Sequence, residues 1–361
     1  MDKITRRSFI KKTAVATVGI TAFPMIFVPK VKAQWARKTI VHPNVDNLRV
    51  VGITDSAMAE AVDSIPRDWA SQERLIRANV VSENMDKLAC KLTEINDINK
   101  AWHTVFVKPL KKSWSETVVA IKTNGIAQQH THSAVMAKTC HVLTDIIGIK
   151  PFNIHIYDAC HGYNLKISAP FAGLPDGVRI ENDWGGSNTE TAIPNPYNNG
   201  LKNSHCLRHL VDGSVDILIN MAMCKGHWAD FGGFTRTMKN HFGTFSPQHH
   251  NGTDYMLAIN QTPEILGHMD KRTGKVHYPR QQLCIVEAFF SNEGFRMVSP
   301  SFQTNFLAMG VFSPIVDYII ATRFRGDKMG WLPNIVATGR MLTEFGFDKS
   351  DLPSGGKLIE A

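Results

Sequence analysis

Hydrophobic residues in this chain occur in two patterns: short continuous runs, and positions spaced three or four residues apart. The continuous runs are rich in branched residues, which is typical of strands buried on both faces of a parallel sheet. They predict strands at 48–54, 117–123, 153–159, 215–223 and 283–289. The spaced positions predict helices at 83–98, 133–146, 313–320 and 334–345.

The order of these elements indicates the fold class. A strand at 117–123, a helix at 133–146 and a strand at 153–159 have the spacing of a βαβ unit with parallel strands. From 173 to 203 the periodicity disappears, and Gly, Pro and Asn are dense, which indicates a long irregular insertion with room for a hairpin. We therefore expect an α/β fold with a mainly parallel sheet flanked by helices, formed by one domain over 34–361.

The first 33 residues have the features of an export signal. A basic head precedes a weakly apolar stretch, and the small residues Val31 and Ala33 predict cleavage before Gln34. The order at 5–11, with paired Arg6 and Arg7, resembles the twin-arginine signal. We expect export through the twin-arginine machinery to the periplasm, a route whose folded passengers often carry a cofactor.

Two alternatives to this signal stay open, an ordinary basic N-terminus and an uncleaved anchor. Pro24 and Pro29 argue against a spanning helix. After cleavage we expect no stable membrane span, because no run of 18 apolar residues occurs.

Charge changes the choice of partner once this segment is set aside. The whole chain has 40 basic and 32 acidic residues and a formal net charge of +8. Seven of the basic residues and one acidic residue lie in 1–33, so 33 and 31 are left, a net charge of +2. Nucleic acid is therefore not an expected partner.

The six cysteines do not form a C-x-x-C motif, so an iron–sulfur cluster is not expected. An even number of cysteines in an exported protein permits disulfides. Four of them lie in or beside apolar runs, which favours buried thiols: Cys140, Cys160, Cys224 and Cys284.

Candidate chemistry lies where the predicted strands end, because ligands of parallel sheets bind beyond the carboxyl ends of the strands. Polar residues follow four of these strands: Lys122 and Asn124, Asp158 and His161, Lys225 and His227, and Glu287. The third strand end is followed by glycines at 232–233 and then by Arg236, Lys239, Asn240, His241 and Gly243.

This last group suits an anion. If 234–241 is helical, Arg236, Lys239 and Asn240 share one face, where they would bind an anionic cofactor or substrate. Glycines such as Gly243 let the backbone approach a ligand closely. The alternative is a solvated basic turn and helix.

Acid–base and metal chemistry are further hypotheses. Asp158, Glu287 and Asp317 could act as acid or base, or they could cap helices or pair with a lysine. Six histidines lie between 205 and 250, and imidazole is a common metal ligand. His161, His227 and His241 are the candidate ligands, although a single histidine is more commonly a surface or core polar residue. No P-loop, dinucleotide-binding fingerprint or G-x-S-x-G elbow is present.

At these residues the chain resembles a known family, domain of unknown function 362. The resemblance rests on 219–227, 233–235 and 238–243, which match the family's order of strand, Asn, Lys-x-His, Thr, Lys-Asn, aromatic residue and Gly. It extends to 120–124, to 285–294 and to 313–317, and covers roughly 117–345. Glu287 and Ser313 depart from it, since the family has Asp at both places. The clustered cysteines of some members are absent, so their iron–sulfur role does not transfer.

A second, fainter resemblance is to nickel-pincer lactate racemases. His227, 231–233, Lys239 and Gly243 are similar to the pattern in which those enzymes use His and Lys to hold a nickel cofactor. The spacing between His and Lys differs, so this resemblance implies a fold and a pocket and not a reaction.

The sequence thus favours a cofactor- or metal-dependent enzyme, of redox or isomerase type, acting on a small anionic substrate. The cofactor would be a transition metal or an anionic organic molecule. In this hypothesis Lys225 and Lys239 hold phosphate or carboxylate, His227 is a ligand or an acid–base group, and Asp158 or Glu287 is the partner carboxylate. The alternatives are a periplasmic binding or maturation protein without turnover, and a structural subunit with a large exposed apolar patch.

Overall fold

The computed structural model describes residues 41–125, 129–158, 165–181, 189–191, 204–227, 234–245, 252–269, 276–293, 299–331, 335–352 and 358–361. The predicted export signal at 1–33 lies outside these residues. Within them, no helix is long and apolar enough to cross a membrane.

A mixed sheet forms the centre of the molecule, with the strand order β14-β1-β13-β12-β7-β2-β3-β4. Neighbouring strands from β12 to β4 run parallel, whereas β13 is antiparallel to both β12 and β1. The expectation of a mainly parallel sheet is confirmed. The strands are β1 (Val50–Thr54), β2 (Val119–Lys122), β3 (Ile154–Tyr157), β4 (Arg179–Glu181), β7 (Ile217–Met223), β12 (Gln281–Ser291), β13 (Phe302–Gly310) and β14 (Ile359–Glu360).

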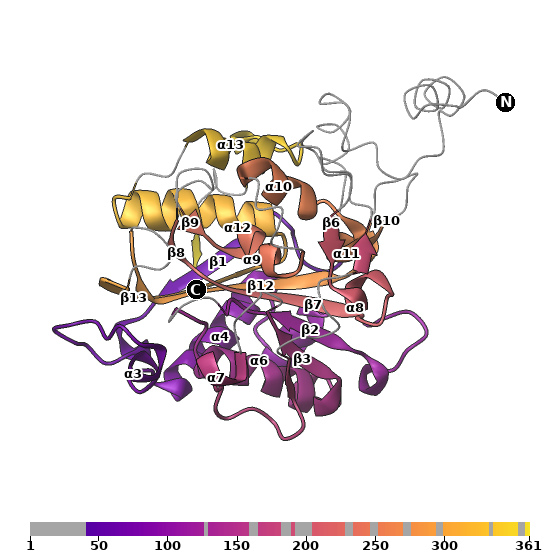
Figure 1. Cartoon of the computed structure of the whole chain (residues 1–361), viewed down its shortest axis with the longest axis horizontal. Coiled ribbons are helices and arrows are strands. Elements are labelled where there is room, and N and C mark those ends of the chain that lie inside the picture. The colour runs from indigo at the N-terminus through magenta and orange to yellow at the C-terminus, as the bar shows by residue number, and fades with distance from the viewer. Residues whose placement is uncertain are drawn as a thin grey trace.

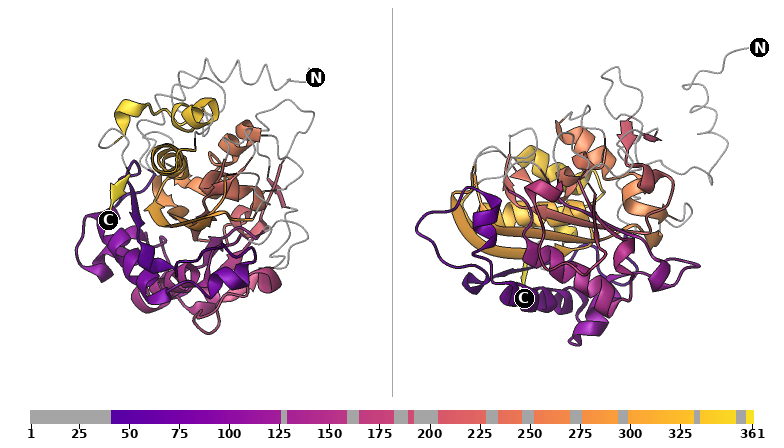
Figure 2. Two further views of the ribbon diagram at one scale, coloured as in Figure 1. Left: turned by 90° about the vertical axis from the view of Figure 1, so that its left-hand side faces the viewer. Right: turned by 60° about the horizontal axis from the view of Figure 1, so that its bottom comes forward.

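Helices cover both faces of this sheet. Figure 1 shows α4, α6 and α7 below it and α10, α12 and α13 above it, and the left view of Figure 2 shows the same layers after a quarter turn. The helices are α3 (Trp69–Glu73), α4 (Ala78–Thr93), α5 (Ile98–Val105), α6 (Ser133–His141), α7 (Leu165–Ser168), α8 (Arg208–Val211), α9 (Thr237–Asn240), α10 (Gly252–Ile259), α11 (Pro263–Leu266), α12 (Ser313–Ile319) and α13 (Ile335–Thr343). π-Helical turns continue α6 and α12: η4 (Val142–Ile146) and η9 (Ile320–Lys328).

Smaller elements complete the fold. Three two-stranded antiparallel ladders pair β5 (Thr189–Thr191) with β6 (Ser204–Cys206), β8 (Lys225–Gly226) with β9 (Phe234–Thr235), and β10 (Gly267–Met269) with β11 (Val276–Pro279). Short 3-10 turns are η2 (Ser56–Met58), η3 (Trp114–Glu116), η5 (Pro151–Asn153), η7 (His241–Gly243) and η10 (Lys349–Asp351). The predicted insertion at 173–203 contributes β4 to the sheet edge and β5 to a ladder.

Two hydrophobic cores lie on opposite faces of the sheet, and β7 shows why its sequence is continuously apolar. The core on the face covered by α4 and α6 contains Ile217, Ile219 and Met221. Leu218 points into the opposite core, which contains residues of α12. Because successive side chains of a strand face opposite sides, a strand buried on both faces needs apolar residues at nearly every position.

Most of the described cysteine thiols are also buried. Cys140, Cys224 and Cys284 are buried and form no disulfide, Cys206 is buried, and Cys90 is partly exposed and forms no disulfide. The prediction of buried thiols is confirmed for three of its four residues, and Cys160 lies outside the described residues.

One predicted helix is different in the structure. Residues 234–235 form β9, and α9 begins only at Thr237. Arg236 precedes the helix with an extended φ of −153°, so it does not share a helical face with Lys239 and Asn240. The pairing of Lys225 with Thr235 accounts for the difference, because it keeps this segment in a ladder.

Candidate functional site

The carboxyl ends of β2, β3, β7 and β12 meet at one edge of the sheet. The strands are parallel neighbours, and Glu287 of β12 lies opposite Met223, the last residue of β7. Polar residues predicted at separate strand ends are thus brought together. We call this region the strand-end cluster, and define it by six residues joined by direct or near contacts: Lys122, Asn124, Asp158, Lys225, Asn240 and Gly243.

Lys122 and Asp158 form a buried ion pair in the cluster. The lysine Nζ lies 3.0 Å from Oδ1 of Asp158, and the two side chains are 1% and 4% exposed. Nζ also donates to Oδ1 of Asn240 at 3.0 Å and to the carbonyl of Thr123. The other carboxylate oxygen accepts from the N–H of Gly125. Asp158 therefore pairs with a strand-end lysine, which is the second of the two interpretations that the sequence left open.

Gly243 allows the backbone of η7 to approach this ion pair. A Cβ atom at position 243 would lie 2.0 Å from Oδ1 of Asp158 and 2.9 Å from Nζ of Lys122. Both distances are far below van der Waals contact. The glycine is therefore required by space, and its backbone lies against a protein ion pair.

Asn240 ties α9 to the strands beneath it. Its Nδ2 donates to the carbonyls of Lys122 and Met221, both at 3.1 Å, and to Oδ1 of Asn220 at 2.9 Å. Asn220 in turn donates to the carbonyl of Thr237 at 2.8 Å. These buried amides fix the start of α9 over the ends of β2 and β7, because an unpaired amide here would be costly.

His241, a predicted metal ligand, is bonded within the protein through both ring nitrogens. Nε2 lies 2.7 Å from Oε1 of Gln281, which only accepts, and 3.0 Å from Nδ2 of Asn220, which only donates, so it has a protein partner in either tautomer. Nδ1 lies 3.1 Å from the hydroxyl of Thr244, which can donate or accept. Burial lowers the pKa of His241 to about 3, so the ring is neutral. This arrangement does not suit metal coordination, since both ring nitrogens are already bonded to neighbouring side chains.

Lys225 and Asn124 meet at the carbonyl of Gln129. Nζ of Lys225 donates to this oxygen at 2.9 Å, and Nδ2 of Asn124 donates to it as well. The N–H of Met223 donates to Oδ1 of Asn124 at 3.2 Å. Residues 129–132, which we call the strap, are therefore held against the ends of β2 and β7.

The strap contributes two buried histidines that the sequence interpretation did not assign. His130 and His132 are both 0% exposed. Nδ1 of His130 lies 2.9 Å from the carbonyl of Asn124, and burial lowers the pKa of the ring to about 4. The pattern that could have indicated them is His-x-His directly after a polar strand end.

Glu287 pairs with His132 of the strap. One carboxylate oxygen contacts Nδ1 of the ring, and the other accepts from the backbone N–H of His132 at 2.9 Å. Burial favours the neutral ring, but the charge of Glu287 and its hydrogen bond outweigh this and raise the pKa of His132. Trp69 stacks on the ring with 6.1 Å between centroids. Glu287, a predicted acid or base, thus anchors the strap to β12.

Arg236 and Asp317 lie together beside the cluster. Nε of Arg236 is 3.8 Å from Oδ1 of Asp317, and both residues are 1% exposed. Burial lowers the pKa of Arg236 to about 10 and raises the pKa of Asp317. Asp317 also accepts from the N–H groups of Thr237 and Met238, both at 3.0 Å, so it caps α9.

Lys239 and His227 are each 8% exposed. Nζ of Lys239 lies 4.6 Å from the ring centroid of Phe242, a cation–π contact. His227 directly follows β8, where the N–H of Gly226 donates to the carbonyl of Asn292 at 3.0 Å. His161 lies outside the described residues. In the part of the chain that the structure describes, no group of three or more His, Cys, Asp or Glu side chains could hold a metal ion.

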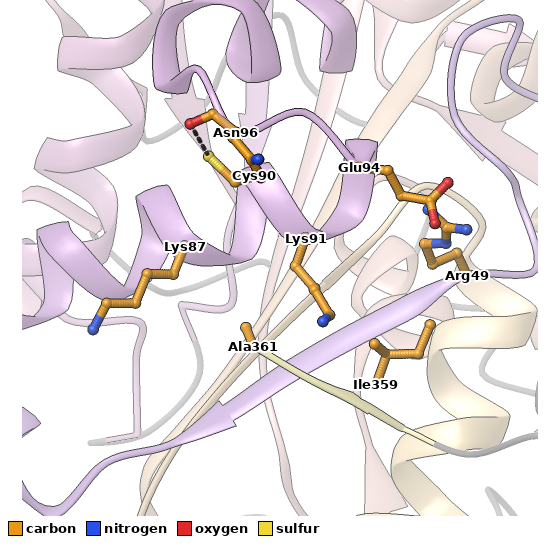
Figure 3. A pocket seen from close by; sticks show the side chains of 8 residues that line it. All are labelled: Arg49, Lys87, Cys90, Lys91, Glu94, Asn96, Ile359 and Ala361. Atoms are coloured by element: carbon orange, nitrogen blue, oxygen red, sulfur yellow. Dashed lines mark hydrogen bonds and ion pairs between the residues drawn. The ribbon is translucent and has the colours of Figure 1, made fainter.

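A pocket of about 460 Å³ lies away from this cluster, beside α4, β1 and β14. Figure 3 shows Arg49 next to Glu94 and Cys90 next to Asn96. The charged atoms of Arg49 and Glu94 lie 2.9 Å apart, and the thiol of Cys90 donates a hydrogen bond to the carbonyl of Asn96. The remaining lining residues are Lys87, Lys91, Ile359 and Ala361. The sequence assigned no function to any of these residues.

Comparison of the chain with protein-family models, curated proteins and solved structures finds no match. The function of the protein is therefore inferred from its fold and from the geometry of the strand-end cluster.

Proposed function

We propose that the protein is exported to the periplasm and holds a small anionic molecule at the strand-end cluster. The observation that carries this proposal is the burial of four basic side chains around one sheet edge. Lys122, Lys225, Arg236 and Lys239 are each 8% exposed or less. Lys122 and Arg236 lie beside the carboxylates of Asp158 and Asp317, so the groups proposed to face the anion are Lys225, which donates to the carbonyl of Gln129, and Lys239, which lies over the ring of Phe242. A buried cation is costly unless negative charge lies nearby, and it attracts an anion more strongly in a medium of low dielectric than in water.

The proposed role of the bound anion is that of a substrate or organic cofactor of a redox or isomerase enzyme. Deep burial supports this choice, because a ligand enclosed by protein exchanges slowly. The alternative is a binding or maturation protein that releases its ligand without turnover. The resemblance to the family domain of unknown function 362 supports the location, since Lys225, His227, Lys239 and Asn240 of its signature lie at this edge.

Metal binding is a weaker part of the proposal. His241 is bonded to Gln281 and Thr244 through its ring nitrogens, which leaves His227 as the described candidate ligand. The third alternative, a structural subunit, receives no support from the exposed large apolar side chains. Those in the described residues come from separate segments: Ile98, Leu110, Phe152, Ile167 and Phe302.

The test begins with protein recovered from the cell envelope of its source. After denaturation, mass spectrometry should find a phosphate- or carboxylate-bearing molecule in stoichiometric amount. Lys225→Met should weaken binding about tenfold and so lower the occupancy, because loss of one buried charge contact costs at least ~1.4 kcal/mol of binding. The matched control is Lys108→Met, which removes an exposed lysine.

Two results would decide between the alternatives. A molecule retained through purification supports the enzyme, and a molecule that dialyses away supports the binding protein. A protein that carries no anion, and whose melting temperature phosphorylated and carboxylated compounds leave unchanged, would contradict the proposed function.

A further inference from the structure

Two ring nitrogens of the strap, Nε2 of His130 and Nε2 of His132, are buried without a hydrogen-bond partner among the described residues. The nitrogen of His130 is the one considered for ligand binding, because this ring is bonded to Asn124 of the strand-end cluster. The strap residues Gln129, His130, Thr131 and His132 are 2% exposed or less. A buried polar atom without a partner costs free energy, and such atoms are rare in folded proteins.

The other nitrogen of this ring defines what Nε2 can do. Nδ1 lies 2.9 Å from the carbonyl oxygen of Asn124, which only accepts, so Nδ1 carries the proton of the neutral ring. Nε2 is therefore an acceptor with a lone pair. The ring is neutral at physiological pH because burial, the largest influence, lowers its pKa to about 4.

His130 is also joined to the strand-end cluster. Asn124, which holds its Nδ1, donates to the carbonyl of Gln129, and Lys225 donates to the same carbonyl. The charges of Lys225 and Asp158 act on the imidazole, with opposite signs. A lone-pair acceptor and a buried ammonium are thus linked, through Asn124 and the carbonyl of Gln129, at the site proposed for the anion.

We propose that Nε2 of His130 accepts a hydrogen bond from a donor group on the bound anion, so that His130 is a specificity-determining residue. The ligand class is then an anion that carries a hydroxyl or another N–H or O–H donor near its phosphate or carboxylate. Lys225 recognises the charge and His130 recognises the donor. This inference rests on the proposed function, because it assumes that an anion binds at the cluster.

This preference arises because only a ligand with a hydrogen-bond donor satisfies Nε2 of His130. A ligand without a donor leaves Nε2 desolvated and unpaired, whereas a ligand with a donor satisfies it. A site that forms a hydrogen bond with a polar group of its ligand strongly rejects analogues that lack this group. An apolar pocket rejects an analogue with an additional hydroxyl less strongly.

The experiment measures binding of matched anion pairs by calorimetry to the full protein. The pairs are glycolate against acetate, and glycerol 3-phosphate against propyl phosphate. The wild-type protein should prefer the hydroxyl-bearing member of at least one pair by about tenfold. His130→Asn keeps a donor near the position of Nδ1 but has no counterpart of Nε2, so it should bind both members of the pair equally.

Two further variants separate specificity from folding. His130→Gln places an amide near the position of Nε2 and should restore part of the preference. His42→Asn changes another buried histidine, whose nitrogens contact Val105, Asn44 and Val45, and should leave the preference unchanged. Circular dichroism at the same pH checks that each variant is folded.

The outcomes distinguish the two proposals. If the wild-type protein binds the anions without preferring the hydroxyl, or if His130→Asn keeps the preference, the role of His130 is overturned and anion binding stands. If the wild-type protein and Lys225→Met both bind none of the four anions, the proposed function fails, and the role of His130 fails with it.

Discussion

At the residue scale, space around single atoms decides which substitutions the cluster tolerates. Gly243 has an ordinary φ, so its backbone conformation does not require glycine. Glycine is required there because the neighbouring ion pair leaves no space for a Cβ atom. A glycine in this position is read from the sequence as a possible ligand contact. The structure shows that a protein carboxylate and ammonium occupy the place where the Cβ would stand.

We predict that Gly243→Ala separates Lys122 from Asp158. Breaking a buried ion pair leaves buried charge uncompensated and costs about 3–5 kcal/mol. Chemical denaturation should show a loss of roughly this size, together with weaker anion binding. Gly339→Ala in α13 is the control, because a Cβ there meets nothing within 4 Å and should stabilise the helix by up to ~1 kcal/mol. Equal stability of the Gly243→Ala and wild-type proteins would show that the ion pair is not formed as described.

We predict that His42 makes the free energy of unfolding smaller at acidic pH. Nδ1 accepts from the N–H groups of Asn44 and Val45, and Nε2 donates to the carbonyl of Val105. Burial lowers the pKa of His42 to about 4, although the bond to Val105 opposes the shift. Its folded pKa is thus below the unfolded value of about 6.5, so stability is complete above pH 6.5 and is lost as the pH falls toward 4.

The measurement is the free energy of unfolding at several pH values. Between about pH 6.5 and pH 4, the wild-type protein should lose about 1.4 kcal/mol per pH unit from this residue alone. In His42→Asn the slope should be smaller by that amount. An unchanged slope would mean that the pKa of His42 is the same in the folded and the unfolded protein.

At the element scale, the link between the strap and β12 holds the start of α6. Glu287 contacts both the ring and the backbone N–H of His132, and Glu73 accepts from the N–H of Ser133 at 3.1 Å. Carboxylates at the N-terminus of a helix satisfy donors that have no partner within the helix. Acidic residues distant in sequence therefore determine where α6 begins.

We predict that His132 and Glu287 are energetically coupled. His132→Gln and Glu287→Gln should each cost about 3–5 kcal/mol, and the double variant should cost clearly less than the sum. Because the folded pKa of His132 is raised, its contribution is complete below about pH 6.5 and is lost as the pH rises through the folded value. Denaturation at about pH 6 and about pH 9 measures both effects, and additive costs would argue against the pair.

At the scale of the whole molecule, positive charge is divided between the first 33 residues and the sheet edge. Most of the formal charge of +8 lies in the first 33 residues, while basic residues of the remaining chain are buried at the sheet edge. The net charge is thus a poor guide to the partner, and the location of charge is a better one.

The export hypothesis makes a prediction for the complete chain. Replacing both Arg6 and Arg7 by lysine keeps the charge but removes the paired arginines, so the precursor should accumulate in the cytoplasm. Cell fractionation and the apparent mass of the protein would detect this. A variant in which Lys11 and Lys12 are both replaced by arginine is the control. Normal export of the double variant Arg6→Lys, Arg7→Lys would contradict the twin-arginine hypothesis.

The sequence was informative about the sheet because burial on both faces leaves a continuous apolar run. Strands β2, β3, β7 and β12 were predicted within a few residues. It was less informative where partners are distant. The antiparallel β13 was not expected: residues 302–305 face outward in part, and its pairing depends on β1 and β12 from both ends of the chain.

By itself, the sequence determined the fold class and the edge of the sheet at which polar residues gather, because apolar periodicity and strand-end polarity are local properties. Only the tertiary structure decided the partners: Asp158 with Lys122, Glu287 with His132, and Asp317 with Arg236 and the start of α9. It also linked His130 to Lys225 through Asn124 and the carbonyl of Gln129. The physical reason is that a buried charge takes whichever partner the packing of distant segments brings within reach, and no local pattern records that choice.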